Sequence, residues 1–87
     1  MPYITPDDRD YLHLPDATAE NAGQLNYQIF TLLFRYMRLH GRSYKTYAEM
    51  AGVLAHVQLE LYRRSTVPYE DRKQLENGDI FPYELTK

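Results

Sequence analysis

The chain has 87 residues, no cysteine and a formal net charge of −2. Its length predicts one small domain over residues 1–87, and the absence of cysteine excludes a disulfide framework. A slightly acidic chain is a poor candidate for nonspecific binding to duplex nucleic acid, and no apolar run approaches the roughly 20 residues of a membrane span. The first ten residues have neither a basic region nor an apolar run, so we expect no signal peptide and a cytoplasmic location.

The first ordered segment is a short helix that begins after Thr5. A capping hydroxyl, proline at the first helical position and two carboxylates in the first turn are typical of a helix start. Pro15 disfavours helical geometry in the preceding residue, so the helix is short. We expect Tyr11, Leu12 and Leu14 to pack it against the rest of the chain, with residues 16–23 as a connector.

A long helix is predicted to begin at Asn21 and to run to the turn at residues 40–43. Asn21 and Gln24 have the spacing of a reciprocal capping box. Two apolar columns recur at helical spacing, and they contain Leu25, Ile29, Leu32, Leu33, Tyr36 and His40 in one and Phe30, Phe34 and Met37 in the other. A helix that is apolar over most of its circumference has to be covered on more than one side.

A tight turn at residues 40–43 joins this helix to a second long helix. Gly41 stands where a left-handed C-cap residue is favoured, and the second helix restarts at Ser43 or at Thr46, which forms a capping box with Glu49. Alternating steps of three and four residues define an apolar seam, which consists of Tyr47, Met50, Leu54, Val57 and Leu61. This is coiled-coil spacing, and Gly52 beside the seam indicates a close packing contact.

A third, short helix is predicted after Thr66. Thr66 provides a cap and Pro68 stands at the first helical position, whereas Asn77 and Gly78 form the stop near Glu76. The tail beyond it carries Ile80, Phe81 and Tyr83, which cover either their own subunit or a neighbour.

These elements predict an all-α fold, an antiparallel helical hairpin with short flanking N- and C-terminal helices. Most of the aliphatic residues lie in the hairpin, so any core must come from it. A domain this small, without disulfides or metal, is only marginally stable alone. We therefore expect a homo-oligomer that assembles through the apolar columns of both long helices.

Charge is distributed unevenly along the chain. Residues 24–66 carry six Lys or Arg and two Glu, whereas residues 1–23 carry five Asp or Glu and one Arg. Arg63 and Arg64, with Tyr62 and Tyr69, form the candidate ligand-binding site for an anionic, nucleotide-like molecule, since guanidinium groups hold phosphates bidentately. The alternative is that Arg63 and Arg64 pair with Glu60 or with other acidic residues.

Other function classes find little support. Glu70, Asp71, Glu76 and Asp79 suggest a metal-dependent nucleotide hydrolase, but acids interleaved with Arg72 and Lys73 are more typical of a solvated helix. His13, His40 and His56 fit no zinc or catalytic spacing. The segment after Ser43 is apolar where a DNA-recognition helix is polar. We predict a non-enzymatic binding protein without cofactor or metal, and a structural assembly protein is the alternative.

Several motifs together carry a resemblance to a known family. They are Met1-Pro2-Tyr3-Ile4, Pro6-x-Asp8-Arg9, Leu25-Asn26-Tyr27, Ser43-Tyr44, Leu59-Glu60-x-Tyr62-Arg63-Arg64, Pro68-Tyr69-Glu70-Asp71-x-Lys73 and Glu76-Asn77-Gly78-Asp79. The chain resembles an uncharacterised family of short phage and prokaryotic proteins, a domain of unknown function. The resemblance implies a prokaryotic or phage source, and it implies no activity. A phage accessory protein that sequesters a host molecule suits a chain of this size.

Overall fold

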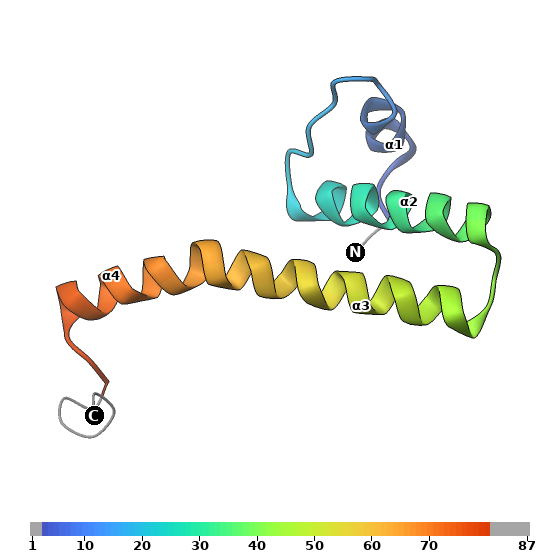
Figure 1. The fold of residues 1–87 in the computed structure, drawn as a ribbon. Coiled ribbons are helices and arrows are strands. Elements are labelled where there is room, and N and C mark those ends of the chain that lie inside the picture. Colours follow the sequence, from blue (N-terminus) through green and yellow to red (C-terminus); the bar gives the residue numbers. More distant parts are fainter. Residues whose placement is uncertain (1–2, 81–87) are drawn as a thin grey trace. The chain divides into compact units, whose positions relative to one another are not determined.

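The computed structural model describes residues 3–80, and within this range every regular element is helical. The elements are α1 (Pro6–Leu12), α2 (Ala22–His40), α3 (Tyr44–Leu61), the π-helical turn η1 (Tyr62–Thr66) and α4 (Val67–Asn77), as Figure 1 shows. The predicted all-α class is therefore confirmed. The predicted tail residues Phe81 and Tyr83 lie outside the described residues.

The chain divides into two compact units, one up to Met50 and one from Ala51. The first unit contains α1, α2 and the start of α3, and the second contains the rest of α3, η1 and α4. Within the first unit, α1 lies against α2 (Figure 1). These contacts between α1 and α2 are tertiary contacts between helices of this unit.

The helix starts in the first unit follow the capping pattern of the sequence. The Thr5 hydroxyl accepts a hydrogen bond from the Asp8 amide at 3.2 Å, and the Asn21 carboxamide accepts one from the Gln24 amide at 2.9 Å. The Gln24 side chain reaches back to the amide of Glu20 at 2.8 Å, one residue earlier than a standard capping box has it. Both predicted starts are confirmed.

Gly41 ends α2 with φ +92°, a positive value that few other residues adopt, and its amide donates to the Met37 carbonyl at 2.7 Å. The cap of α3 is Ser43, whose hydroxyl accepts from the Thr46 amide at 3.2 Å. The alternative start at Thr46 is wrong. Thr46 lies inside the first turn and is almost fully buried. It is not the cap, because the Ser43 hydroxyl already occupies that role at the Thr46 amide.

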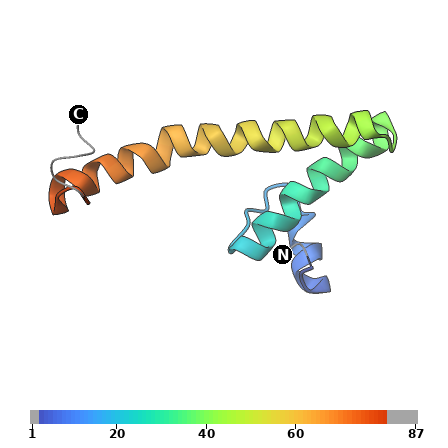
Figure 2. The same cartoon turned by 90° about the horizontal axis from the view of Figure 1, so that it is seen from below.

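The predicted break before the third helix is also wrong. Thr66 has helical dihedral angles and no side-chain capping bond, whereas a cap residue is normally extended. Instead the Val67 amide donates to the Tyr62 carbonyl, five residues back. This wider turn lies just before Pro68, whose ring in a regular helix would crowd the Arg64 carbonyl. Figure 2 shows α3 leading through the turn into α4 without an interruption.

The end of α4 agrees with the prediction. The helix ends at Asn77, and Gly78 follows with φ +86° and an amide that donates to the Gln74 carbonyl at 2.8 Å. Asn77 and Gly78 therefore form the stop that the sequence indicated.

The described residues contain no buried hydrophobic side chain. The two buried residues of residues 3–80 are Gln24 and Thr46, both polar and both in first turns of helices. The expectation that any core comes from the two long helices stays a prediction, because α2 and most of α3 belong to different units. Their apolar columns are too many for one small chain to cover, and most of those side chains remain accessible to solvent.

Candidate functional site

The structure brings two of the four predicted ligand-binding residues together. Arg63 and Arg64 lie on η1, and both contact Glu60, one turn earlier. The Arg63 Nη2 atom lies 2.9 Å from Glu60 Oε1, and the Arg64 Nε atom lies 2.9 Å from Glu60 Oε2. The pairing alternative for these two residues is thus confirmed, and the cluster keeps one net positive charge.

These ion pairs change the acidity of Glu60. Hydrogen bonds from Arg64, and then from Arg63, lower the pKa of the Glu60 carboxyl below its ordinary value of 4.5. The carboxyl is therefore ionised at neutral pH. An anionic ligand at the two guanidinium groups would have to compete with this carboxylate.

The two predicted tyrosines lie apart from that pair in their contacts. Tyr62 is exposed on η1, and no hydrogen bond or ring contact joins Tyr62 or Tyr69 to Arg63 or Arg64 within residues 3–80. Tyr69 on α4 instead lies beneath its own helix neighbours, with Arg72 Cζ at 6.0 Å and Lys73 Nζ at 5.7 Å from the ring centroid. Cation–π contacts of this kind already occupy the ring.

Glu70 and Asp71 of α4, and Asp79 after its end, are among the residues that line a shallow hollow of about 340 Å³. Lys73 neutralises Glu76 at 3.3 Å. In the part of the chain that the structure describes, no group of three His, Asp or Glu side chains has a geometry that would hold a metal ion.

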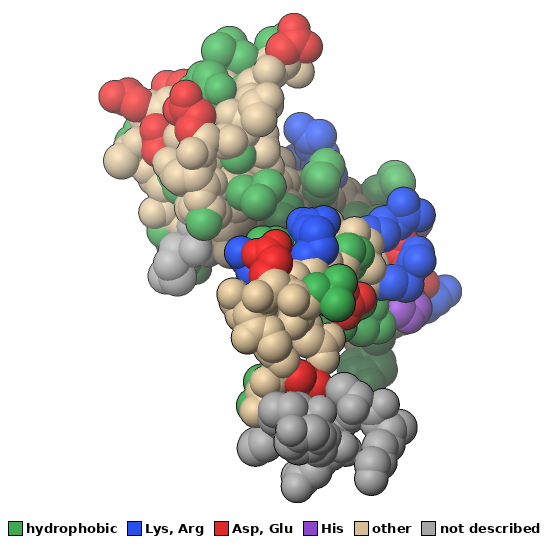
Figure 3. Space-filling model, turned by 90° about the vertical axis from the view of Figure 1, so that its left-hand side faces the viewer, with side chains coloured by type: hydrophobic (Ala, Val, Ile, Leu, Met, Phe, Trp, Pro, Cys, Tyr) green, Lys and Arg blue, Asp and Glu red, His purple; other side chains and the backbone are tan. Residues whose placement is uncertain are grey.

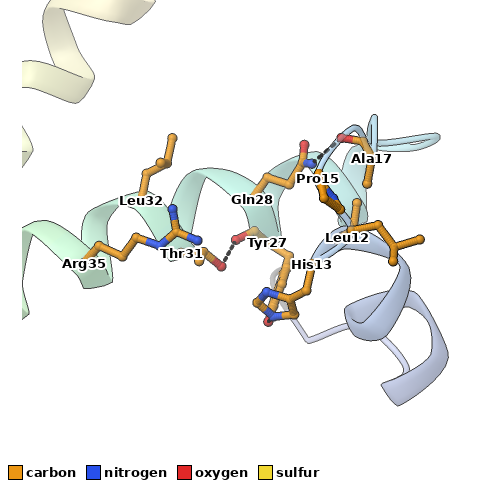
Figure 4. A pocket seen from close by; sticks show the side chains of 10 residues that line it. Leu12, His13, Pro15, Ala17, Tyr27, Gln28, Thr31, Leu32 and Arg35 are labelled. Atoms are coloured by element: carbon orange, nitrogen blue, oxygen red, sulfur yellow. Dashed lines mark hydrogen bonds between the residues drawn. The ribbon is translucent and has the colours of Figure 1, made fainter.

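A second hollow, of about 390 Å³, lies in the first unit, between α2 and the segment that follows α1 (Figure 4). Leu12, Leu14, Pro15, Ala17 and Leu32 provide apolar lining, and His13, Tyr27, Gln28, Thr31 and Arg35 provide polar lining. Sequence reasoning missed this site, because it treated residues 16–23 as a connector only.

Hydrogen bonds hold the wall of this hollow. His13 Nε2 and the Tyr27 hydroxyl lie 3.0 Å apart, with the rings edge to face, and Gln28 Nε2 donates to the Ala17 carbonyl at 3.3 Å. The polar residues Gln28, Thr31 and Arg35, three and four positions apart on α2, are the signal in the sequence that could have found this wall. His13 is the C-cap residue of α1.

A third polar group joins α2 to the first turns of α3 inside the first unit. The Tyr36 hydroxyl donates to Glu49 Oε1 at 2.9 Å, and the Tyr36 ring stacks on His40 with centroids 4.2 Å apart. The hydrogen bond to Glu49 raises the pKa of the Tyr36 phenol. Glu49 therefore accepts a hydrogen bond from α2, and it does not form the predicted capping box with Thr46.

A scan against protein families matches residues 1–80 to the domain of unknown function DUF6899. The chain belongs to this family. A search of curated proteins finds no match. A search of solved structures also finds none. The motifs that carry the resemblance, from Met1 to Asp79, all lie inside the matched range.

The most extensive feature of this DUF6899 chain is its exposed apolar surface, part of which Figure 3 shows among charged side chains. In the second unit Val57 and Leu61 of the α3 seam are 59% and 62% exposed, and Leu54 is 41% exposed. In the first unit Phe30 and Leu32 of α2 are also exposed. No helix in residues 3–80 is long and apolar enough to cross a membrane.

Proposed function

We propose that this DUF6899 protein is a non-enzymatic interaction protein that works as a homo-oligomer. The α3 seam of one copy packs against the same seam of another copy. The single observation that supports this proposal best is the absence of any buried hydrophobic side chain in residues 3–80. Burial of apolar surface is the main force that stabilises folded chains, and exposed apolar side chains of this number favour a covering surface.

The composition of the seam fits an interface between copies. Residues 50–59 contain no Asp, Glu, Lys or Arg, while Glu49 and Glu60 stand at the two ends of this stretch. The centres of protein interfaces are depleted in charge and their rims are polar. The same helix thus carries an apolar centre and a charged border, which favours a protein partner over solvent.

A second copy is the occupant that the sequence favours. The heptad-like spacing of Leu54, Val57 and Leu61 is the spacing with which one helix packs against another of the same kind. Two copies of the seam also have apolar stretches of equal length, so each can cover the other completely. A host protein on the same surface is the alternative occupant, and it fits a phage accessory role in the cytoplasm.

The helical hairpin forms part of this proposal. The hydrogen bond from Tyr36 to Glu49 supports an approach of α2 to the start of α3, because it joins residues on either side of the Gly41 turn. A hairpin that closes in this way leaves the outer faces of both long helices for a partner.

The test is native mass spectrometry of freshly purified protein, with the chain mass of 10.3 kDa as the unit. A mass at a small multiple of this unit is the expected result. A monomer under all conditions contradicts self-assembly, and a regular particle of many copies supports the structural assembly alternative. Extra mass on each copy would identify a retained ligand.

An anionic, nucleotide-like ligand at Arg63 and Arg64 is the second candidate. It is favoured by one observation, that two largely exposed guanidinium groups share a single carboxylate and retain a positive charge. Titration calorimetry with ATP tests it. Binding that Arg63→Ala with Arg64→Ala abolishes, and that Glu60→Gln strengthens, supports the site. Unchanged binding in the double variant excludes it, and Lys45→Ala serves as a control for charge alone.

A further inference from the structure

The hollow between α2 and the segment after α1 has a cation at one end that no other described group neutralises. Among residues 3–80, Arg35 forms neither a hydrogen bond nor an ion pair. Figure 4 shows its guanidinium group extending along α2 toward Thr31, on the side of the helix that lines the hollow. Arg38 on the same helix differs, because its Cζ atom lies 5.9 Å from the centroid of the Phe34 ring.

The remaining polar groups of the hollow are held in place. The Thr31 hydroxyl donates to the Tyr27 carbonyl at 2.9 Å, Gln28 holds the Ala17 carbonyl, and Tyr27 pairs with His13. Four hydrogen-bonded side chains from two segments therefore keep the wall in one arrangement. A wall that is already arranged loses little conformational entropy when it takes up a ligand.

The rest of the lining is apolar. Leu12, Leu14 and Pro15 come from the end of α1 and the residues after it, and Leu32 comes from α2. Small-molecule sites combine apolar walls with a few placed polar groups, in volumes of roughly 300–1,000 Å³. The volume of about 390 Å³ lies at the lower end of that range.

We propose that this hollow binds a small organic monocarboxylate with an aromatic or branched aliphatic body. The carboxylate pairs with the Arg35 guanidinium group, which has the planar fork that matches two carboxylate oxygens. The apolar body lies against Leu12, Pro15 and Leu32. All the residues that line this site belong to the first unit, and none of them belongs to the α3 seam or to the Arg63 and Arg64 cluster.

A single cation determines the charge of the ligand. One guanidinium group balances one carboxylate, whereas a polyphosphate needs several cations to offset its charge. Arg35 is the one Lys or Arg among the residues that line the hollow. The site therefore favours a monoanion, and it differs in ligand class from the nucleotide-like ligand of the second candidate function.

The experiment is a titration of the ¹⁵N-labelled full chain, in its natural oligomeric state, with 2-naphthoate, followed by amide chemical shifts. We expect shifts confined to amides around the hollow, including Ala17, Gln28 and Thr31, with a Kd of about 1 mM, as for a small ligand in an open site. The neutral isostere 2-naphthamide separates charge recognition from apolar contact.

Two matched variants test the role of Arg35. Arg35→Gln removes the cation and weakens 2-naphthoate binding by about tenfold, the usual effect of losing a charged hydrogen bond. Arg38→Gln, on the same helix and outside the lining, leaves the affinity unchanged. Circular dichroism confirms that both variants keep their helices.

Several results would overturn the proposal. These are equal binding of naphthoate and naphthamide, equal affinity of wild type and Arg35→Gln, and shifts that centre on Val57 and Leu61 instead of the hollow. The last result would mean that the aromatic body adheres to the exposed seam. A monomeric protein that still binds 2-naphthoate through Arg35 would support this site while it contradicts the proposed self-assembly.

Discussion

The two units of the chain differ in the reach of their side-chain hydrogen bonds. In the unit up to Met50, side chains connect separate segments, as His13 does with Tyr27 and as Tyr11 does with the Thr18 carbonyl at 2.9 Å. In the unit from Ala51, each side-chain ion pair of the described residues joins positions three or four apart on one helical run, such as Glu60 with Arg64.

This difference shows which kind of interaction stabilises the structure of each unit. Connections between segments create tertiary structure, and in the first unit they produce a hollow with fixed walls. Pairs within one helix support only that helix, by a few tenths of a kcal/mol each. Under the proposed self-assembly the second unit gains most from its partner, and we expect changes to its apolar seam to have the largest effect.

The largest expected effect is that of Val57→Glu on self-association. Val57 belongs to the seam and is accessible in the isolated chain, so the substitution costs little there. In the proposed interface it buries an unpaired carboxylate, which costs several kcal/mol. We expect the oligomer to dissociate to 10.3 kDa chains in light scattering after size exclusion.

Gln58→Glu is the matched control for Val57→Glu, because it introduces the same carboxylate on the same helix outside the seam. It is expected to keep the oligomer intact. If both variants dissociate, charge on α3 in general explains the result. If neither does, the seam is not the interface.

Asn21→Ala is expected to have the next largest effect, and it acts on the first unit. The substitution leaves the Gln24 amide without its capping partner, and loss of such a cap costs about 1 kcal/mol. Urea denaturation measures the change. Asn26→Ala, on the surface of the same helix, should stay within about 0.5 kcal/mol of wild type. Equal losses in the two variants would contradict the capping role.

Gly52→Ala tests the second unit by a substitution that is expected to stabilise its helix. A Cβ atom placed on Gly52 meets no atom within 4 Å, so the isolated helix has room for it. Alanine in a helix interior is favoured over glycine by about 1 kcal/mol. We expect a gain of up to this size in the free energy of unfolding, without loss of self-association. A weaker oligomer would instead reveal the close helix contact that the sequence analysis anticipated at Gly52.

The smallest expected effect is the pH dependence of the pairs around Glu60. The folded pKa of this carboxyl is lowered, so its contribution to stability is complete above the ordinary value of 4.5 and disappears as pH falls through the lowered pKa. Helicity measured by circular dichroism should show a slight decrease in that acidic range. Glu60→Gln should lack this component of the titration, and an identical titration in the variant would refute the assignment.

The sequence by itself determined the helical class, most helix ends and the membership of the DUF6899 family. Local chemistry is sufficient for these features, since Thr5, Asn21 and Ser43 act on amides three residues away and Gly41 and Gly78 act on their own dihedral angles. The pairing of Arg63 and Arg64 with Glu60 was also an expectation of the sequence, because i,i+3 and i,i+4 positions meet on any helix.

Tertiary structure alone decided the remaining points. The signal of Thr66 and Pro68 is the same for a new helix as for a π-turn in a continuing one, and only the path of the chain distinguishes them. Glu49 has two partners within reach of its sequence position, and the approach of Tyr36 selects one. The hollow at Arg35 forms because Gln28 and Tyr27 contact residues more than ten positions away, and no local pattern encodes such a meeting.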